Sequence, residues 1–125
     1  MPSKGDNRRK KGADAETIAL AHLETVGYSL LCRNFRTMYG EIDLIMVEEG
    51  SGGLIFIEVK SGVKSVFPGY LEAVNEKKYR KIAQVAAEFI ENQDREYPLY
   101  RVDAVFVERG LAKQVFHIKN VYYLA

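Results

Sequence analysis

Two apolar stretches, separated by a connection rich in Gly and Ser, dominate the middle of the chain between residues 41 and 60. Positions 42 and 44–47 are apolar on both faces of an extended strand, and so are positions 54–57 and 59. Such unbroken runs are typical of strands buried on both sides of a sheet. The pattern therefore predicts a β-hairpin, made of residues 41–47 and 54–60, in the interior of a sheet.

The rest of the chain alternates between helical and extended patterns. Residues 12–26 have apolar side chains three and four positions apart, as in an amphipathic helix, and Gly27 ends this pattern. Further patterns predict a strand at 28–36, a second helix at 71–91, and strands at 101–108 and 113–122. The order α-β-β-β-α-β-β is that of an α/β protein. We expect a three-layer core in which helices flank a mixed sheet.

The predicted hairpin also contains four charged residues: Glu41, Asp43, Glu58 and Lys60. Because side chains alternate along a strand with a period of two, all four emerge on one face. A turn centred in the Gly and Ser connection places Val47 opposite Leu54 and Asp43 opposite Glu58. Two opposed carboxylates repel each other, so they need a cation between them or a proton on one of them. Mg²⁺ fits, because it takes one or two carboxylates and keeps several waters.

The same charges allow a purely structural interpretation. Glu41 and Lys60 would form a cross-strand ion pair, while Asp43 and Glu58 would be solvated at the edge of a sheet. Strands as apolar as these are not typical of a sheet edge. We therefore favour the interpretation in which the carboxylates bind a cation.

Length and composition limit the class of protein. With 125 residues, 47% hydrophobic and 28% charged, the chain is expected to form one globular domain. It contains no apolar run long enough for a transmembrane helix and no secretory signal, so we expect a cytoplasmic protein without a membrane partner. The single cysteine, Cys32, excludes an internal disulfide, and one cysteine with two histidines is too few for a structural zinc site.

Positive charge is concentrated at the N-terminus, although the net charge is only +1. Residues 1–11 contain five basic side chains and one acidic side chain, with no periodicity. We expect a flexible basic tail at 1–11, followed by the domain at 12–125. The tail either contacts phosphates or simply keeps the chain in solution.

Several basic residues near the predicted hairpin are candidates for binding nucleic acid. Arg33 and Arg36 can hold phosphates or neutralise nearby carboxylates. Lys64 lies in a stretch with Gly and Pro that predicts a long loop beside the site. Lys78 is on the apolar stripe of the second helix, where it either joins the site or extends to solvent. Lys81 belongs to the basic outer face of that helix.

Two further carboxylates each have two explanations. Glu16 is on the apolar stripe near the start of the first helix. It either interacts with the helix dipole or reaches Asp43 and Glu58 as a third acidic group. We favour the second interpretation. Asp103 alternates with apolar neighbours close to Arg101. These two residues form either an ion pair near the site or, as we favour, a structural pair.

The spacing of the charged residues resembles a nuclease signature. Asp43 followed by Glu58-Val59-Lys60 resembles the D…(D/E)xK core of the PD-(D/E)xK, or restriction-endonuclease-like, superfamily. The segments GEIDLI and FIEVKS are similar to those of the YraN-like family of small bacterial proteins, which resemble archaeal-type Holliday-junction resolvases. The resemblance covers nearly the whole chain after residue 12, and both Glu16 and Lys78 match positions of the family. Ile42 departs from the proline of the superfamily name.

The resemblance implies a restriction-endonuclease-like fold and an endonuclease that depends on Mg²⁺ or Mn²⁺. Its substrate would be nucleic acid, with DNA favoured and branched DNA one alternative. Asp43, Glu58 and the main-chain carbonyl of Val59 would hold the metal. Lys60 would orient or deprotonate the attacking water, and Glu16 would hold a second metal or orient a metal-bound water. A nucleic-acid-binding module without activity and a structural interaction protein are the alternatives. The oligomeric state stays open, with a homodimer one alternative.

Overall fold

The structure, a computed structural model, describes residues 4–63, 76–110, 114–122 and 124. The elements follow one another in the predicted order, which confirms the α/β class. They are α1 (Lys4–Thr25), β1 (Tyr28–Thr37), β2 (Gly40–Glu48), β3 (Leu54–Gly62), α3 (Glu76–Glu91), β4 (Tyr100–Glu108) and β5 (Val115–Tyr122). None of the helices in the described ranges is long and apolar enough to cross a membrane.

Within the described residues, the five strands form one sheet in the order β1-β2-β3-β4-β5. Neighbouring strands are antiparallel except β3 and β4, which are parallel and have α3 between them in the chain. The sheet is therefore mixed, as predicted. In the β2–β3 hairpin, Val47 pairs with Leu54 and Leu44 pairs with Ile57, which is the register expected from a turn in the Gly and Ser connection.

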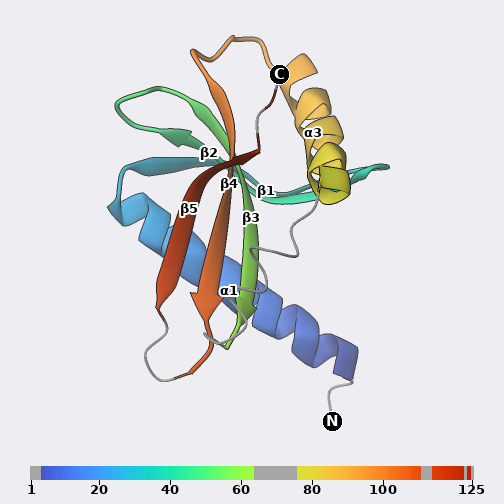
Figure 1. The fold of residues 1–125 in the computed structure, drawn as a ribbon, viewed down its shortest axis with the longest axis vertical. Helices are drawn as coiled ribbons and strands as arrows, with labels where there is room; N and C mark the ends of the chain where they lie inside the picture. Colours follow the sequence, from blue (N-terminus) through green and yellow to red (C-terminus); the bar gives the residue numbers. More distant parts are fainter. Residues whose placement is uncertain (1–3, 64–75, 111–113, 123, 125) are drawn as a thin grey trace.

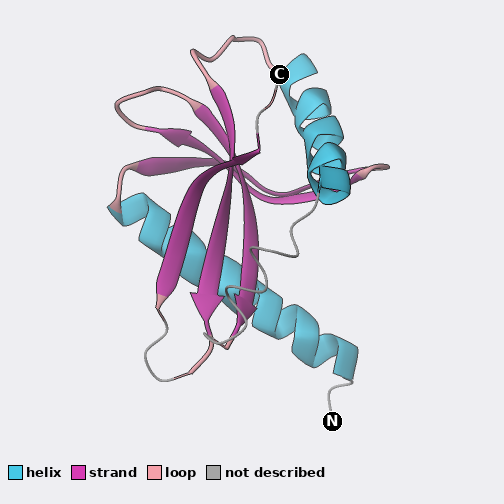
Figure 2. Cartoon of the chain, in the orientation of Figure 1, coloured by secondary structure: helices cyan, strands magenta, loops and turns pink. Residues whose placement is uncertain are grey.

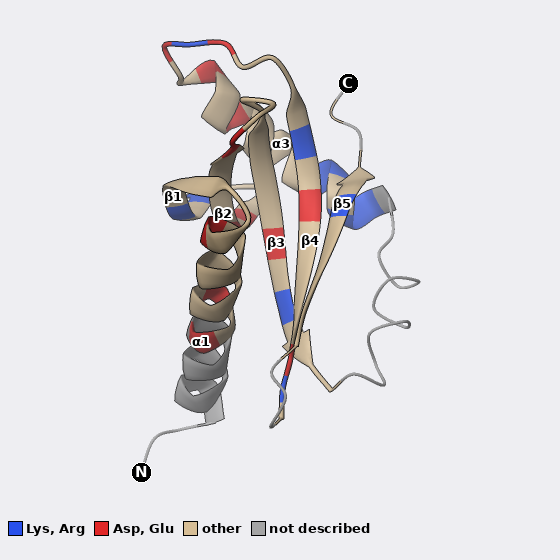
Figure 3. Cartoon of the chain, turned by 90° about the vertical axis from the view of Figure 1, so that its left-hand side faces the viewer, with Lys and Arg blue, Asp and Glu red and all other residues tan. Residues whose placement is uncertain are grey.

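The two helices cover opposite faces of the sheet (Figures 1 and 2). On one face, Ala19 and Leu23 of α1 pack against apolar side chains of β2, β3 and β4. On the other face, Val85 and Phe89 of α3 pack in a second cluster that includes Phe56. In the side view of Figure 3 the sheet lies between α1 and α3, and charged positions interrupt the otherwise uncharged strands β3 and β4. This layering explains why β2 and β3 are apolar on both faces.

The start of α1 differs from the prediction. The helix begins at Lys4 rather than at residue 12, so residues 4–11, predicted as part of a flexible tail, are helical in the structure. These residues include several Arg and Lys, which have good helix propensity, and extending a formed helix costs less than starting one. The buried stripe of α1 consists of Ala15, Ala19 and Leu23, and Glu16 is next to this stripe.

The bounds of two other predicted segments differ from those of the described elements. Strand β3 continues to Gly62, so the first residues of the predicted loop belong to the strand. Helix α3 begins at Glu76, and residues 71–75 of the predicted second helix lie outside the described residues. Lys64 also lies outside them, so its predicted contact with nucleic acid stays a prediction.

Candidate active site

In the β2–β3 hairpin, backbone pairing gives way to a side-chain hydrogen bond where the charged residues begin. Backbone pairing ends with Leu44 opposite Ile57. Next to this pair, the Oδ2 atom of Asp43 accepts a hydrogen bond from the main-chain N–H of Val59, with a distance of 2.7 Å. Glu58 precedes that amide in the chain. The side chain of Asp43 is therefore fixed against β3, whereas the predicted pairing of Asp43 with Glu58 is not among the backbone pairs of the described hairpin.

A cleft of about 310 Å³ opens at this place, between the strands and α3. Asp43, Glu58 and Lys60 line it together, so the structure brings these three predicted residues to one cleft. Helix α3 contributes Lys78 and Lys81. The remaining lining residues are Tyr39, Gly40, Glu41, Val59, Ile82 and Val85. The structure thus brings most of the predicted site residues into one cleft, while their chemical roles stay predictions.

The surroundings of Asp43 favour its protonated form. Burial is the main reason why the pKa of Asp43 is raised from 3.8 to about 7. The negative charges of Glu16, Glu58 and Glu41 raise this pKa as well, in that order. The hydrogen bond from Val59 acts in the opposite direction. A cation among these carboxylates would relieve the repulsion that the sequence indicated.

Two lysines of the cleft come close to Glu58. The Nζ atom of Lys78 lies 2.6 Å from Glu58 Oε1, and the Nζ atom of Lys60 lies 3.8 Å from the same oxygen. The side chain of Glu58 is only 13% exposed, so its charge is largely shielded from water. Lys78 faces the site, which is one of the two positions that the helix pattern allowed. Its contact with nucleic acid stays a prediction.

Glu16 reaches this region from α1 and is connected to β1 by Asn34. With its side-chain amide oriented to donate, Asn34 Nδ2 lies 3.1 Å from Glu16 Oε2 and 2.9 Å from Glu41 Oε1. The backbone of Asn34 has a φ of 54°, in the left-handed region that Asn tolerates better than most residues. Sequence reasoning missed this role of Asn34, because neither the φ angle nor the two carboxylates can be identified from a strand pattern.

The two arginines of β1 each pair with one of these carboxylates. Arg33 Nη2 lies 3.6 Å from Glu16 Oε2, and Arg36 Nε lies 3.2 Å from Glu41 Oε2. These contacts agree with the neutralising role that the sequence left open. Arg36 remains 76% exposed, so a second ligand can reach its guanidinium group. Whether either arginine also contacts phosphate stays a prediction.

The oxygen atoms of the cleft are of the type that hard divalent cations prefer. Asp43, Glu58 and Val59 line the cleft, and carboxylate and main-chain carbonyl oxygens are ligands that Mg²⁺ takes together with water. Among the described residues, no three carboxylate, imidazole or thiolate side chains lie close enough together to hold a metal by themselves. A cation here would therefore need water, and not only side chains, to complete its shell. The metal-binding roles of Asp43, Glu58, Val59 and Glu16 remain predictions.

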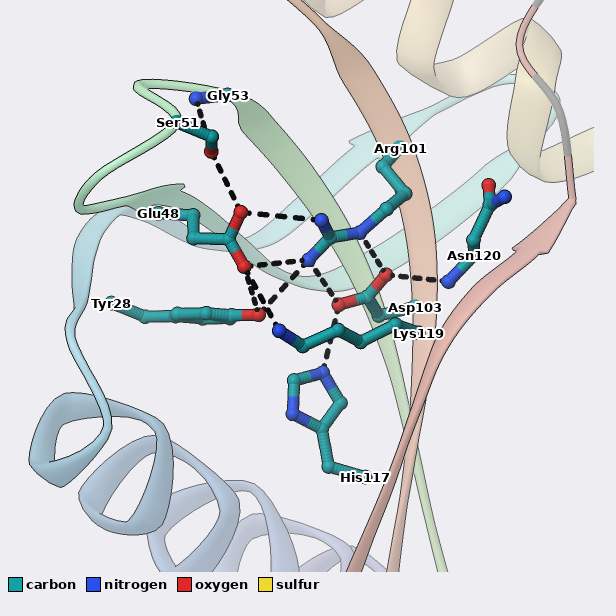
Figure 4. Close-up of polar contacts among 9 residues, drawn as sticks. All are labelled: Tyr28, Glu48, Ser51, Gly53, Arg101, Asp103, His117, Lys119 and Asn120. Atoms are coloured by element: carbon teal, nitrogen blue, oxygen red, sulfur yellow. Dashed lines mark hydrogen bonds and ion pairs between the residues drawn. The ribbon is translucent and has the colours of Figure 1, made fainter.

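A second polar cluster lies at the other end of β2, around Arg101 (Figure 4). Arg101 Nε donates to Asp103 Oδ1 at 2.7 Å and Nη2 donates to Asp103 Oδ2 at 3.0 Å. The same guanidinium donates to both carboxylate oxygens of Glu48, at 3.2 and 3.0 Å. The hydroxyl of Tyr28 donates to Glu48 Oε2 at 2.8 Å. Arg101 thus joins carboxylates from two strands, β2 and β4.

Asp103 is fully buried within this cluster. Its Oδ2 is 2.7 Å from His117 Nε2, and its Oδ1 accepts a hydrogen bond from the main-chain N–H of Asn120 at 2.9 Å. Burial alone would raise the pKa of Asp103, but the hydrogen bonds from His117, Arg101 and Asn120 outweigh burial and hold this pKa below its ordinary value. The contacts agree with the structural interpretation of the Arg101–Asp103 pair.

Comparison with known proteins places the chain in a family. The sequence model of the uncharacterised protein family UPF0102 matches residues 15–107. The chain belongs to this family. A UPF0102 protein of Mycolicibacterium smegmatis is 34% identical over 116 residues, which cover 91% of this chain and 94% of that protein. A UPF0102 protein of a Sulfurihydrogenibium species is 34% identical over 118 residues, which cover 94% of this chain and 98% of that protein.

The family match confirms the resemblance drawn from GEIDLI and FIEVKS, because UPF0102 is the YraN-like, PD-(D/E)xK nuclease-like group. Among solved structures, SfsA of Pyrococcus furiosus in complex with Ca²⁺ is similar at 17% sequence identity and a TM-score of 0.32. The matched part covers 91% of this chain and 64% of the SfsA chain. A likeness at this TM-score adds nothing to the interpretation of the cleft.

Proposed function

We propose that this UPF0102 protein is a metal-dependent endonuclease that hydrolyses phosphodiester bonds in nucleic acid, with DNA as the favoured substrate. The observation that carries the proposal is the common cleft of Asp43, Glu58 and Lys60. Two carboxylates and one lysine, from neighbouring strands, provide ligands for a cation and a group that can orient or deprotonate the attacking water.

In this proposal Asp43, Glu58 and the carbonyl of Val59 would hold Mg²⁺ or Mn²⁺. The bound cation would polarise the scissile phosphate and lower the pKa of a coordinated water. Lys60 orients or deprotonates the attacking water. The water oxygen then forms a bond to phosphorus, the ester bond to the leaving oxygen breaks, and that oxygen takes up a proton from Lys60 or from solvent. Glu16, which Asn34 contacts, would hold a second metal or orient a metal-bound water.

The basic side chains on the wall of the cleft have a separate task. Lys81 of α3 lines the cleft and is exposed, so it can hold a phosphate next to the scissile one. Lys78 pairs with Glu58 in the free protein, and a phosphate that enters the cleft would compete for its ammonium group. We expect both lysines to position the backbone of nucleic acid without reading its sequence.

The proposal is tested by a cleavage assay with single-stranded, duplex, flap and four-way substrates in Mg²⁺ or Mn²⁺. The wild type should cut at least one substrate, and Asp43→Asn should abolish cleavage because it removes a negative charge that holds the cation. Asp94→Asn is a matched control, since Asp94 is exposed in the loop between α3 and β4. It should cut like the wild type.

A binding module without cleavage is the second candidate function. One observation favours it: the ammonium group of Lys78 already neutralises Glu58 at 2.6 Å, which weakens the attraction of the cleft for a cation. In that case, the wild type would bind nucleic acid and cut none of the substrates with either metal. Cleavage that Asp43→Asn leaves unchanged would also refute the proposed site.

A further inference from the structure

The turn between β1 and β2 exposes two large side chains. Thr37 pairs with Gly40, so Met38 and Tyr39 form a two-residue loop at the tip of this hairpin. Met38 is 89% exposed and Tyr39 is 44% exposed. In Figure 1 this tip extends past α3 at the right-hand edge of the molecule. A methionine exposed to this extent at a projecting tip gains nothing from burial in the fold.

The turn itself does not require these two residues. Tight hairpin turns typically use Gly, Asn, Asp, Pro or Ser. Here the positive φ is provided by Gly40, at +147°, while Met38 and Tyr39 have no positive φ. The hydroxyl of Thr37 accepts a hydrogen bond from the main-chain N–H of Tyr39 at 3.0 Å. The backbone of the tip is thus stabilised by Thr37 and Gly40, so the two exposed side chains remain available for an external contact.

The hairpin tip lies at the rim of the candidate cleft. Tyr39 and Gly40 line the cleft, and a Cβ atom placed on Gly40 would lie 3.9 Å from Val85 of α3. Arg36, one residue before Thr37, is 76% exposed. Lys81 contributes positive charge from the α3 side of the same cleft. Apolar and aromatic side chains beside exposed cations are the combination that binds bases and phosphates of single strands.

We propose that Met38 and Tyr39 contact unstacked bases of the substrate, so that the cleft favours nucleic acid with unpaired bases over continuous duplex. The ring of Tyr39 stacks on one base, and Met38 fills the space next to it as an apolar wedge. This inference rests on the proposed function, because the strand held by the tip is the one that continues into the cleft. It assigns the tip, which no sequence motif marked, the role of selecting the substrate.

The test measures binding by the full-length chain in the presence of a chelator, so that no cleavage occurs. The probes are a labelled oligonucleotide of about 20 nucleotides, its blunt duplex, and the same duplex with an unpaired gap. The wild type should bind the single strand and the gapped duplex more tightly than the blunt duplex. Tyr39→Ala should weaken the first two by roughly 5- to 100-fold, the loss expected for one base–aromatic stack. The blunt duplex should change little.

Three further variants separate stacking from other effects. Tyr39→Phe keeps the ring and should bind like the wild type, while Met38→Ala should lose part of the preference. Leu31→Ala is the matched control, because Leu31 is 46% exposed on β1 but does not line the cleft. It should bind all three probes like the wild type. Thermal unfolding should change little in these variants, since Met38 is 89% exposed and Tyr39 and Leu31 are nearly half exposed.

Several results would overturn the inference. The wild type could bind the three probes with equal affinity, or bind none of them. Alternatively, Tyr39→Ala could lose affinity equally for all three probes, or bind them as the wild type does. Sedimentation that shows a dimer in the wild type and a monomer in Met38→Ala would instead identify the tip as a self-association surface. If the wild type cleaves but the tip variants keep its preference, only this inference fails. If tip-dependent binding is present without cleavage, the endonuclease proposal fails instead.

Discussion

At the scale of single residues, Asp43 is held where its charged form, which the proposed chemistry needs, lowers the stability of the fold. Its carboxyl is held against β3 by the amide of Val59, yet burial and neighbouring carboxylates disfavour its charge. Near neutral pH the folded protein must either keep a proton on this group or tolerate the repulsion. Functional sites often lower the free energy of unfolding in this way, and a neutral substitution then raises it.

The pH dependence of stability tests this conflict. The pKa of Asp43 is about 7 in the folded protein and 3.8 as an ordinary carboxyl, so the folded state holds the proton more tightly. Its contribution to the free energy of unfolding is therefore present below pH about 4 and is lost as the pH rises through 7. Asp43→Asn keeps an oxygen for the amide of Val59 and stays neutral. With a chelator present, we expect this variant to be about 1 kcal/mol more stable than the wild type at pH about 8.

Urea unfolding of both proteins at about pH 4, 6 and 8 measures this difference. The advantage of the variant should be smallest at the lowest pH, where the wild type is protonated in its folded state. Adding Mg²⁺ at pH about 8 should stabilise the wild type more than the variant, because the proposed cation site would exist only in the folded state. An advantage that stays constant with pH would show that the charge of Asp43 is not its source.

At the scale of elements, the cluster around Arg101 connects strands that are distant in the sequence. Glu48 ends β2, Asp103 lies in β4, and His117 lies in β5. The guanidinium of Arg101 and the other donors hold the pKa of both carboxylates below the ordinary range, with Arg101 the largest cause for Glu48. Such a buried network is costly to break, because a lost partner leaves a charge without compensation.

We expect Asp103→Ala to reduce the free energy of unfolding by about 3 kcal/mol or more, because Arg101 and His117 lose a fully buried partner. Arg36→Ala, at the exposed ion pair with Glu41, is the control and should cost about 1 kcal/mol or less. Chemical unfolding at neutral pH compares the two. Equal losses would contradict the structural role of the cluster.

The same cluster predicts the behaviour of the protein in acid. A carboxylate whose pKa is lowered by folding contributes stability above its unfolded pKa, and that contribution is lost as the pH falls through the folded value. The pKa values of Glu48 and Asp103 are both lowered. The wild type should therefore lose stability steeply below pH about 4. A variant without the Asp103 carboxyl should show a shallower loss, measured by unfolding along a pH series.

At the scale of the whole molecule, the distribution of charge matters more than the net charge of +1. The exposed Lys81 lies at the cleft, whereas the exposed Arg95 lies beyond the far end of α3, over the ring of Tyr97. Both are basic, but only Lys81 is placed where the proposed substrate binds. This difference allows a specific phosphate contact to be separated from a general effect of charge.

We expect Lys81→Glu to weaken binding to nucleic acid and to reduce its salt dependence. Loss of one phosphate contact lowers the slope of log K against log salt by about 0.9 on duplex DNA. Arg95→Glu makes the same change of net charge and should leave the slope unchanged. Binding titrations at several salt concentrations with chelator measure both. An equal effect of the two variants would point to net charge alone.

The order of elements, the central hairpin and its register could all be predicted from the pattern of residues along the chain. The period-two pattern predicted a common face for Asp43, Glu58 and Lys60, which line one cleft, and pairing of Val47 with Leu54 follows from where the turn residues lie. These features are local, because they depend on alternation and turn chemistry over a short stretch of chain. The family motif lies in that same stretch, which is why it could be identified from the residues alone.

The tertiary structure alone decided which distant residues meet. Asn34 joins Glu16 to Glu41, Lys78 faces Glu58, and the tip formed by Met38 and Tyr39 lies at the rim of the cleft. The cluster that links His117 to Asp103 is likewise formed by separate strands. No periodicity encodes these contacts, because they depend on how the helices pack on the sheet and on the left-handed backbone of Asn34 and Asn120. Such packing is set by the whole core rather than by the neighbours of a residue in the sequence.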